Sequence, residues 1–129
     1  MSKYLYYAVF DYEDGNYNVS FPDLPGCLTF GETMSEALRM AKDALEGHLL
    51  VMEDYKDDIP NPSEPADIAL TENSLLIPIE VDTQLVRFKE ENKSIKKTLT
   101  IPKYLNILGE ENGINFSQLL KDALEQRLT

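Results

Sequence analysis

The sequence predicts an α+β protein made of two small modules, and three observations support this class. The chain begins with alternating aromatic and β-branched segments, continues into one long amphipathic helix, and ends with a short basic strand followed by two helices. Its 129 residues suffice for one ordinary domain or two very small ones. The expected order is β-β-β-α-β over residues 1–83, a polar, mildly helical linker over 84–93 and β-α-α over 94–129.

The first two strands form a predicted hairpin. Residues 3–10 are rich in aromatic and β-branched side chains, and the run ends before Gly15, which follows Asp and signals a turn. Residues 17–21 then alternate large apolar with small polar side chains, as a half-buried strand does. Two prolines and a glycine in residues 22–27 end that strand, and we expect a third short strand over 28–31.

The main helix is predicted from Met34 to Asp54, where apolar residues recur at spacings of three and four. Thr33 and Glu36 form a capping-box pattern at its start. Residues 56–73 contain three prolines and little periodicity, which indicates a surface connector. Residues 74–81 form the fourth strand, and the proline within it places that strand at a sheet edge, because proline has no backbone donor.

The C-terminal module, residues 94–129, is too small to bury a core alone. Below roughly 40 residues a chain usually needs a disulfide, a metal or a second copy. Cys27 is the only cysteine and lies outside this module, so a homodimer is the physical choice. A strand over 94–101 would then pair antiparallel with the same strand of the second copy, and helices over 103–111 and from 116 would cover this ribbon.

Alternation assigns the two faces of the ribbon. Leu99 and Ile101 should face the helices, which leaves Lys96, Thr98 and Thr100 pointing outwards. A two-stranded ribbon fits the major groove of DNA, where Lys reaches guanine acceptors and Thr offers a hydroxyl or a methyl group. The alternative is an exposed edge strand in which Lys only discourages aggregation. We expect Lys96, Thr98 and Thr100 to contact DNA.

The start of the last helix adds a second group of predicted DNA contacts. Asn115, followed three residues later by Gln118, resembles a capping box. Free backbone N–H groups at a helix start are suited to a DNA phosphate. Asn115, Phe116 and Ser117 therefore join the predicted DNA-binding residues.

The charge is unevenly distributed. The formal net charge of -11 argues against a polybasic nucleic-acid binder, but residues 1–83 hold four basic and seventeen acidic residues, a net charge of -13. Residues 84–129 hold eight basic and six acidic residues, a net charge of +2. The acidic module suits a basic protein partner. The alternative is that its acidity only keeps a small domain soluble.

Two stretches carry a resemblance to known families. Residues 94–129, above all Lys96–Ile101 and Gly113–Leu120, look like the ribbon-helix-helix repressors. Residues 4–55 resemble the N-terminal domain of HicB antitoxins, most specifically in the Phe-Pro-Asp-Leu-Pro-Gly-Cys run of residues 21–27. The resemblance implies a partial, degenerate RNase H-like domain followed by a ribbon-helix-helix dimerisation domain.

This resemblance implies an antitoxin of a type II HicBA toxin-antitoxin system. Such a protein binds and inhibits a HicA toxin, a small basic ribonuclease that cleaves mRNA, and represses its own operon by binding operator DNA. The residues that would contact the toxin are not assigned by the sequence. The sequence leaves open whether the predicted dimers join into a higher oligomer.

Two other readings stay open. One is a stand-alone ribbon-helix-helix regulator without a cognate toxin. The other is a residual metal-dependent nuclease, but Asp11 finds no carboxylate partner in the second strand and is equally explained as a residue near the turn. His48 lies on the long helix with no nucleophile to pair with. We expect no enzyme activity, no catalytic residue, no cofactor and no metal.

The sequence also bears on the compartment. No stretch approaches the roughly 20 apolar residues that cross a bilayer, and the start lacks the layout of a signal peptide. A single cysteine fits a reducing environment. A cytoplasmic location, without a membrane partner, is the expectation.

Overall fold

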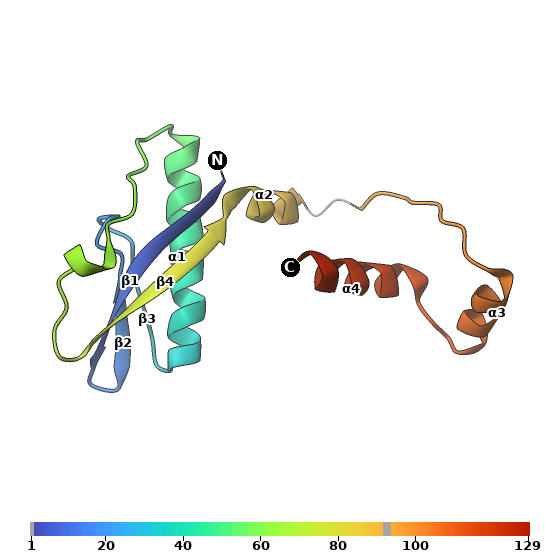
Figure 1. Cartoon of the computed structure of the whole chain (residues 1–129), viewed down its shortest axis with the longest axis horizontal. Coiled ribbons are helices and arrows are strands. Elements are labelled where there is room, and N and C mark those ends of the chain that lie inside the picture. The colour runs from blue at the N-terminus through green and yellow to red at the C-terminus, as the bar shows by residue number, and fades with distance from the viewer. Residues whose placement is uncertain (1, 92–93) are drawn as a thin grey trace. The chain divides into compact units, whose positions relative to one another are not determined.

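The computed structural model describes residues 2–91 and 94–129, which form two compact units (Figure 1). The N-terminal unit is Met1–Asn92 and the C-terminal unit is Lys93–Thr129. The described residues form a four-stranded antiparallel sheet and four α-helices, which confirms the predicted mixture of strands and helices.

The sheet of the N-terminal unit has the strand order β3-β2-β1-β4, with every neighbouring pair antiparallel. Its strands are β1 (Lys3–Glu13), β2 (Asn16–Ser20), β3 (Leu28–Gly31) and β4 (Ser74–Asp82). The predicted hairpin joins β1 to β2 through Asp14 and Gly15, both with positive φ (52° and 82°). The fourth strand, which contains Pro78, lies at an edge of the sheet as predicted and pairs with β1.

Helix α1 (Met34–Asp54) has the predicted bounds and covers one face of the sheet. Its buried stripe comprises Ala37, Ala41, Leu45 and Leu49. Small residues allow close contact: a Cβ added at Gly31 would stand 2.4 Å from the backbone nitrogen of Ala37. This contact joins the edge strand β3 to the first turn of the helix.

The capping box of α1 forms only in part. Thr33 Oγ1 accepts a hydrogen bond from the backbone N–H of Glu36 at 3.1 Å, as predicted. The Glu36 carboxylate, however, accepts from the backbone N–H of Glu32 at 3.4 Å instead of from Thr33. The prolines of the connector after α1 allow a short 3₁₀ turn, Pro65–Asp67, before β4 begins.

The region predicted as a mildly helical linker, residues 84–93, is mostly helical and is attached to the N-terminal unit. Helix α2 (Thr83–Glu91) fills most of it and belongs to the N-terminal unit, while residues 92 and 93 lie outside the described part of the chain. The helix is not a free connector because Arg87 reaches back to the end of α1. The sequence gives no sign of this attachment, because the acidic partners of Arg87 lie more than thirty residues earlier.

The C-terminal unit contains α3 (Lys103–Glu111) and α4 (Phe116–Leu128), in agreement with the two predicted helices. Gly113, with φ of 67°, ends the turn after α3 and allows the Ile114 N–H to donate to the Gly109 carbonyl at 2.9 Å. Residues 94–101 carry neither helix nor strand in this single chain. A strand that pairs only with a second copy has no partner here, so the predicted ribbon stays a prediction.

Candidate nucleic-acid and partner interfaces

The C-terminal unit has no buried side chain among its described residues. Leu119 is 57% exposed, and Leu108 of the other helix is 50% exposed. Large apolar side chains in water are costly, at about 25 cal/mol per Å² of apolar surface. The unit therefore presents the incomplete core that its length predicts.

A groove of about 470 Å³ shows how residues 97–101 relate to α4. Lys97, Leu99 and Ile101 line one part of it, so alternate residues of the predicted strand share one face. Helix α4 supplies much of the remaining apolar lining, including Leu119 and Leu120. The structure thus places Leu99 and Ile101 towards the helix, on the face that alternation predicts.

Lys96, Thr98 and Thr100 are exposed and do not line this groove. They are the residues that alternate with the groove-lining set. Their hydroxyl and ammonium groups are accessible to solvent, which is the condition for reading base edges in a DNA groove.

The three residues predicted to bind DNA at the start of α4, Asn115, Phe116 and Ser117, have different structural roles. Asn115 Oδ1 accepts from the Gln118 N–H at 3.0 Å and caps the helix, while the Gln118 side chain bonds Asp122 instead of returning to Asn115. The ring of Phe116 packs on α3, because a Cβ added at Gly109 would stand 2.5 Å from its Cζ atom. Ser117 borders the groove. Any phosphate contact of Phe116 must therefore use its backbone N–H.

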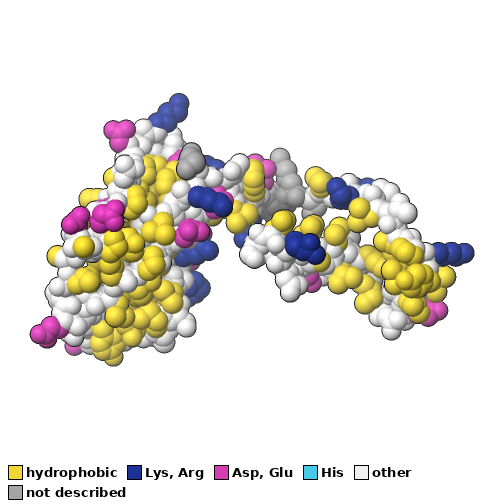
Figure 2. All heavy atoms as spheres, viewed as in Figure 1, with side chains coloured by type: hydrophobic (Ala, Val, Ile, Leu, Met, Phe, Trp, Pro, Cys, Tyr) yellow, Lys and Arg dark blue, Asp and Glu magenta, His cyan; other side chains and the backbone are white. Residues whose placement is uncertain are grey.

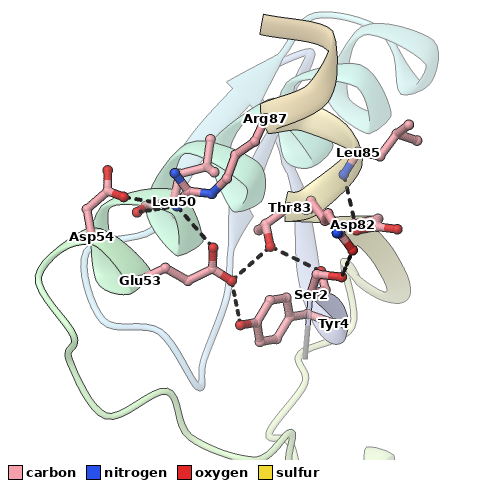
Figure 3. A network of polar contacts seen from close by, with 10 residues as sticks. Ser2, Tyr4, Leu50, Glu53, Asp54, Asp82, Thr83, Leu85 and Arg87 are labelled. Carbon is pink, nitrogen blue, oxygen red and sulfur yellow. Dashed lines mark hydrogen bonds and ion pairs between the residues drawn. The ribbon is translucent and has the colours of Figure 1, made fainter. Parts of the chain in front are cut away.

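A polar network fastens α2 to α1 and β1 in the N-terminal unit (Figure 3). Tyr4 and the buried Thr83 both donate their hydroxyl protons to Glu53 Oε2, at 2.7 Å and 2.8 Å. Arg87 contacts the other oxygen of Glu53 at 3.1 Å and also Asp54 at 3.0 Å. Three elements that are distant in sequence meet at one carboxylate.

The network shifts the pKa values of Glu53, Tyr4 and Arg87, and hydrogen bonds to Glu53 and Asp54 raise that of Arg87. Burial opposes ionisation of Glu53, but hydrogen bonds from Tyr4, Thr83 and Arg87 outweigh it and lower the Glu53 pKa. Burial, together with the neighbouring Glu53 carboxylate, raises the pKa of Tyr4 to about 12. The charged Glu53 and the neutral Tyr4 therefore stabilise each other at neutral pH.

Sequence reasoning missed this network. In the sequence, Tyr4 is one of several aromatic residues in a predicted strand, Glu53 is a polar residue of the predicted helix, and Arg87 belongs to the predicted linker. Their sequence separations of 49 and 34 residues leave no local pattern to connect them. The only available signal was the mild helical character of the predicted linker.

The other titratable residues singled out in the sequence form no reactive cluster. Asp11 accepts a hydrogen bond from the Ser74 hydroxyl, which joins β1 to the start of β4. Burial raises the pKa of the Cys27 thiol to about 11, and this side chain is 3% exposed. Among the described residues no group of three or more His, Cys, Asp or Glu side chains is placed to hold a metal ion.

The surface of the N-terminal unit combines hydrophobic and acidic areas. Figure 2 shows hydrophobic side chains gathered over the sheet, with acidic side chains around them. Leu28 and Phe30 of the edge strand β3 are 68% and 55% exposed. None of the helices in the described ranges is long and apolar enough to span a bilayer.

The family described as HicB-like antitoxin of bacterial toxin-antitoxin system matches residues 6–121. The chain belongs to this family. The match covers both units, so the sequence resemblance to HicB proteins is confirmed at the level of the family.

Curated relatives include one phage protein and two named antitoxins. An uncharacterised 14.9 kDa protein of Haemophilus phage HP1 is 34% identical over 103 residues, 78% of this chain and 75% of that protein. Antitoxin HicB 1 of Photorhabdus laumondii is 37% identical over 95 residues, 66% of this chain and 59% of the relative. For Antitoxin HicB 2 of the same organism, the match spans about half of each protein, 49% and 46%, at 42% identity.

Solved structures agree with the fold of the whole chain. A chain of a toxin-antitoxin complex from Streptococcus pneumoniae has a TM-score of 0.60 and 32% identity, and the match covers 97% of this chain and 99% of the other. The Burkholderia pseudomallei antitoxin HicB has a TM-score of 0.53, with full coverage of both chains. At 21% identity this second match shows a shared fold alone.

Proposed function

We propose that this protein is the antitoxin of a type II HicBA system, which inhibits a HicA toxin by direct binding and represses its own operon. The observation that carries the proposal is the family match across both units. Acidic residues dominate residues 1–83, which suits the RNA-binding surface of a basic ribonuclease. Inhibition then needs no chemistry from this chain, because covering that surface excludes mRNA.

The N-terminal unit, as a partial RNase H-like domain, binds the toxin in this proposal. Its acidic surface provides electrostatic complementarity, and its own buried core gives the interface a rigid support. The relative from Streptococcus pneumoniae is part of a toxin-antitoxin complex, which supports the same kind of partner here.

The C-terminal unit acts in this proposal as a ribbon-helix-helix homodimer on operator DNA. Its unburied apolar side chains and its groove support pairing with a second copy. Residues 87–103 contain six basic and two acidic residues, a local charge of +4 that favours phosphate. Lys96, Thr98 and Thr100 read bases, and the backbone N–H groups at the start of α4 bind phosphate.

The two activities are separable, and this gives a direct test. Replacing Lys96, Thr98 and Thr100 together by Ala should weaken operator binding by about 100-fold or more, because each base contact contributes about 1–3 kcal/mol. Toxin neutralisation should survive, since these residues lie in the other unit. Operator binding is measured by electrophoretic mobility shift and neutralisation by growth after toxin induction.

Lys121→Ala is the matched control, because it removes an exposed lysine on α4 outside the predicted ribbon. It should leave operator affinity within about threefold of the wild type, as an exposed charge without a base contact does. Loss of neutralisation in the triple variant would contradict the division of labour. Absence of toxin binding by the wild-type chain would contradict the proposed antitoxin function itself.

A further inference from the structure

Strand β3 (Leu28–Gly31) ends the sheet, and no other strand in the described residues pairs with its outer edge (Figure 1). The backbone N–H of Phe21 donates to the Cys27 carbonyl at 3.2 Å, which sets the register of the ladder between β2 and β3. In an antiparallel ladder alternate residues bond the neighbouring strand. Leu28 and Phe30 therefore direct their backbone N–H and C=O groups away from β2.

The same two residues expose their side chains. Leu28 is 68% and Phe30 is 55% exposed, whereas Gly31 is buried against Ala37 of α1. Side chains alternate along a strand, so Leu28 and Phe30 lie on the face away from α1. Edge strands of soluble proteins usually carry charges that prevent pairing, but this strand offers apolar side chains and open backbone groups together.

The charge around this edge selects the kind of partner. From residue 4 to residue 38 the chain has no basic residue. The acidic residues of this stretch are Asp11, Glu13, Asp14, Asp23, Glu32 and Glu36. A second copy would bring two such acidic stretches together, whereas a basic protein would find complementary charge.

We infer that β3 is the docking strand for a small basic protein, which adds a strand of its own to this edge and covers Leu28 and Phe30. Strand addition uses main-chain hydrogen bonds for affinity and alternate side chains for specificity. The inference rests on the proposed function, in which that basic protein is the HicA toxin, and it assigns the contact surface that the sequence leaves open.

The test is Phe30→Lys, measured by calorimetric titration of the full-length chain with the HicA-type toxin encoded beside its gene. A lysine removes apolar contact and adds a positive charge that a basic partner repels. The toxin should bind at least about 30-fold more weakly, as for a residue at the centre of an interface. Leu28→Ser removes apolar surface without adding charge and should weaken binding by about tenfold.

Leu75→Lys is the matched control, because Leu75 is 48% exposed and lies on β4, the opposite edge strand. It should bind the toxin within about threefold of the wild type, since energetically neutral surface positions dominate outside an interface. Circular dichroism and operator binding of each variant report whether the chain remains folded.

The outcomes separate the inference from the proposed function. Wild-type affinity in the Phe30→Lys and Leu28→Ser variants would overturn the assignment of β3 while leaving an antitoxin intact. Unchanged toxin affinity with a smaller assembly mass in ultracentrifugation would assign β3 to contacts between copies and would also overturn it. If the wild-type chain itself fails to bind the toxin, the proposed function falls, and this assignment falls with it.

Discussion

The two units differ in how far they bury their apolar side chains. The N-terminal unit buries large side chains such as Tyr6, Phe10 and Leu45 between its sheet and α1, each at most 1% exposed. In the C-terminal unit even the best-placed apolar side chains of α3 and α4 remain partly in water. The difference teaches that correct caps and turns in α3 and α4 do not by themselves bury a hydrophobic core.

The largest expected effect is a core truncation in the N-terminal unit. Leu45→Ala removes a fully buried side chain from α1 and should lower the free energy of unfolding by about 3 kcal/mol through lost burial and the cavity left behind. Urea denaturation followed by circular dichroism measures this loss, which should be the same at every protein concentration.

Leu120→Ala in the C-terminal unit is the counterpart, because Leu120 is only half-buried in the single chain and lines the groove. If this unit pairs with a second copy as proposed, the melting midpoints of the wild type and of the variant should both fall as the protein is diluted, since the stability of a dimer depends on protomer concentration. A concentration-independent melt of residues 94–129 would show that this unit is stable alone.

A smaller effect comes from adding a methyl group at two close contacts. Gly31→Ala places a Cβ 2.4 Å from the backbone nitrogen of Ala37 and should cost about 2–3 kcal/mol, because a helix backbone cannot move aside locally. Gly109→Ala meets the far end of the Phe116 side chain at 2.5 Å, and that side chain is 39% exposed, which leaves it room to shift.

The second substitution should cost less than about 1 kcal/mol, because alanine also favours helix α3. Thermal melts of both variants give the comparison. Equal losses would mean that the contact between α3 and α4 is as rigid as the contact between β3 and α1.

A pH-dependent effect is expected for the network that attaches α2. Glu53→Gln should lower the free energy of unfolding by about 1–2 kcal/mol at pH 7, because hydrogen bonds to a charged acceptor are replaced by weaker ones. The folded-state pKa of Glu53 lies below its ordinary value of 4.5, so this stabilisation is present above about pH 4.5 and is lost as the pH falls through the folded-state pKa.

The wild type and the variant should therefore converge in stability in acid, as measured by urea denaturation from pH 7 to pH 3. Glu80→Gln on the exposed face of β4 is the control and should show little difference at any pH. A pH-independent gap between Glu53→Gln and the wild type would contradict the role of the ionised carboxylate.

Local patterns sufficed for most of the elements. The bounds of α1 follow from apolar spacing after Thr33, and Pro78 places its strand at an edge because it lacks a donor. Alternation also assigns Leu99 and Ile101 to the groove. Local patterns did not show how α2 is attached, because the ion pairs of Arg87 depend on carboxylates brought near only by folding.

In the candidate sites, too, some features follow from local sequence patterns and others depend on tertiary packing. Alternation in a short segment predicts that Lys96, Thr98 and Thr100 point outwards, and this stays a prediction because every residue from 94 to 101 is exposed. The packing of the Phe116 ring on Gly109 has no such local pattern, because it depends on how two helices approach each other. The edge strand β3 was predicted as a strand, yet its place at the end of the sheet follows from the strand order alone.

By itself the sequence determined the two modules, their opposite charge and the helical and extended segments, because periodicity, turn residues and net charge are local properties of a chain. Tertiary structure alone decided that Tyr4, Glu53, Thr83 and Arg87 meet at one carboxylate, and that Leu28 and Phe30 stand at an open edge. Those outcomes depend on which distant segments pack together, and long-range packing leaves no periodic trace in the residues that it joins.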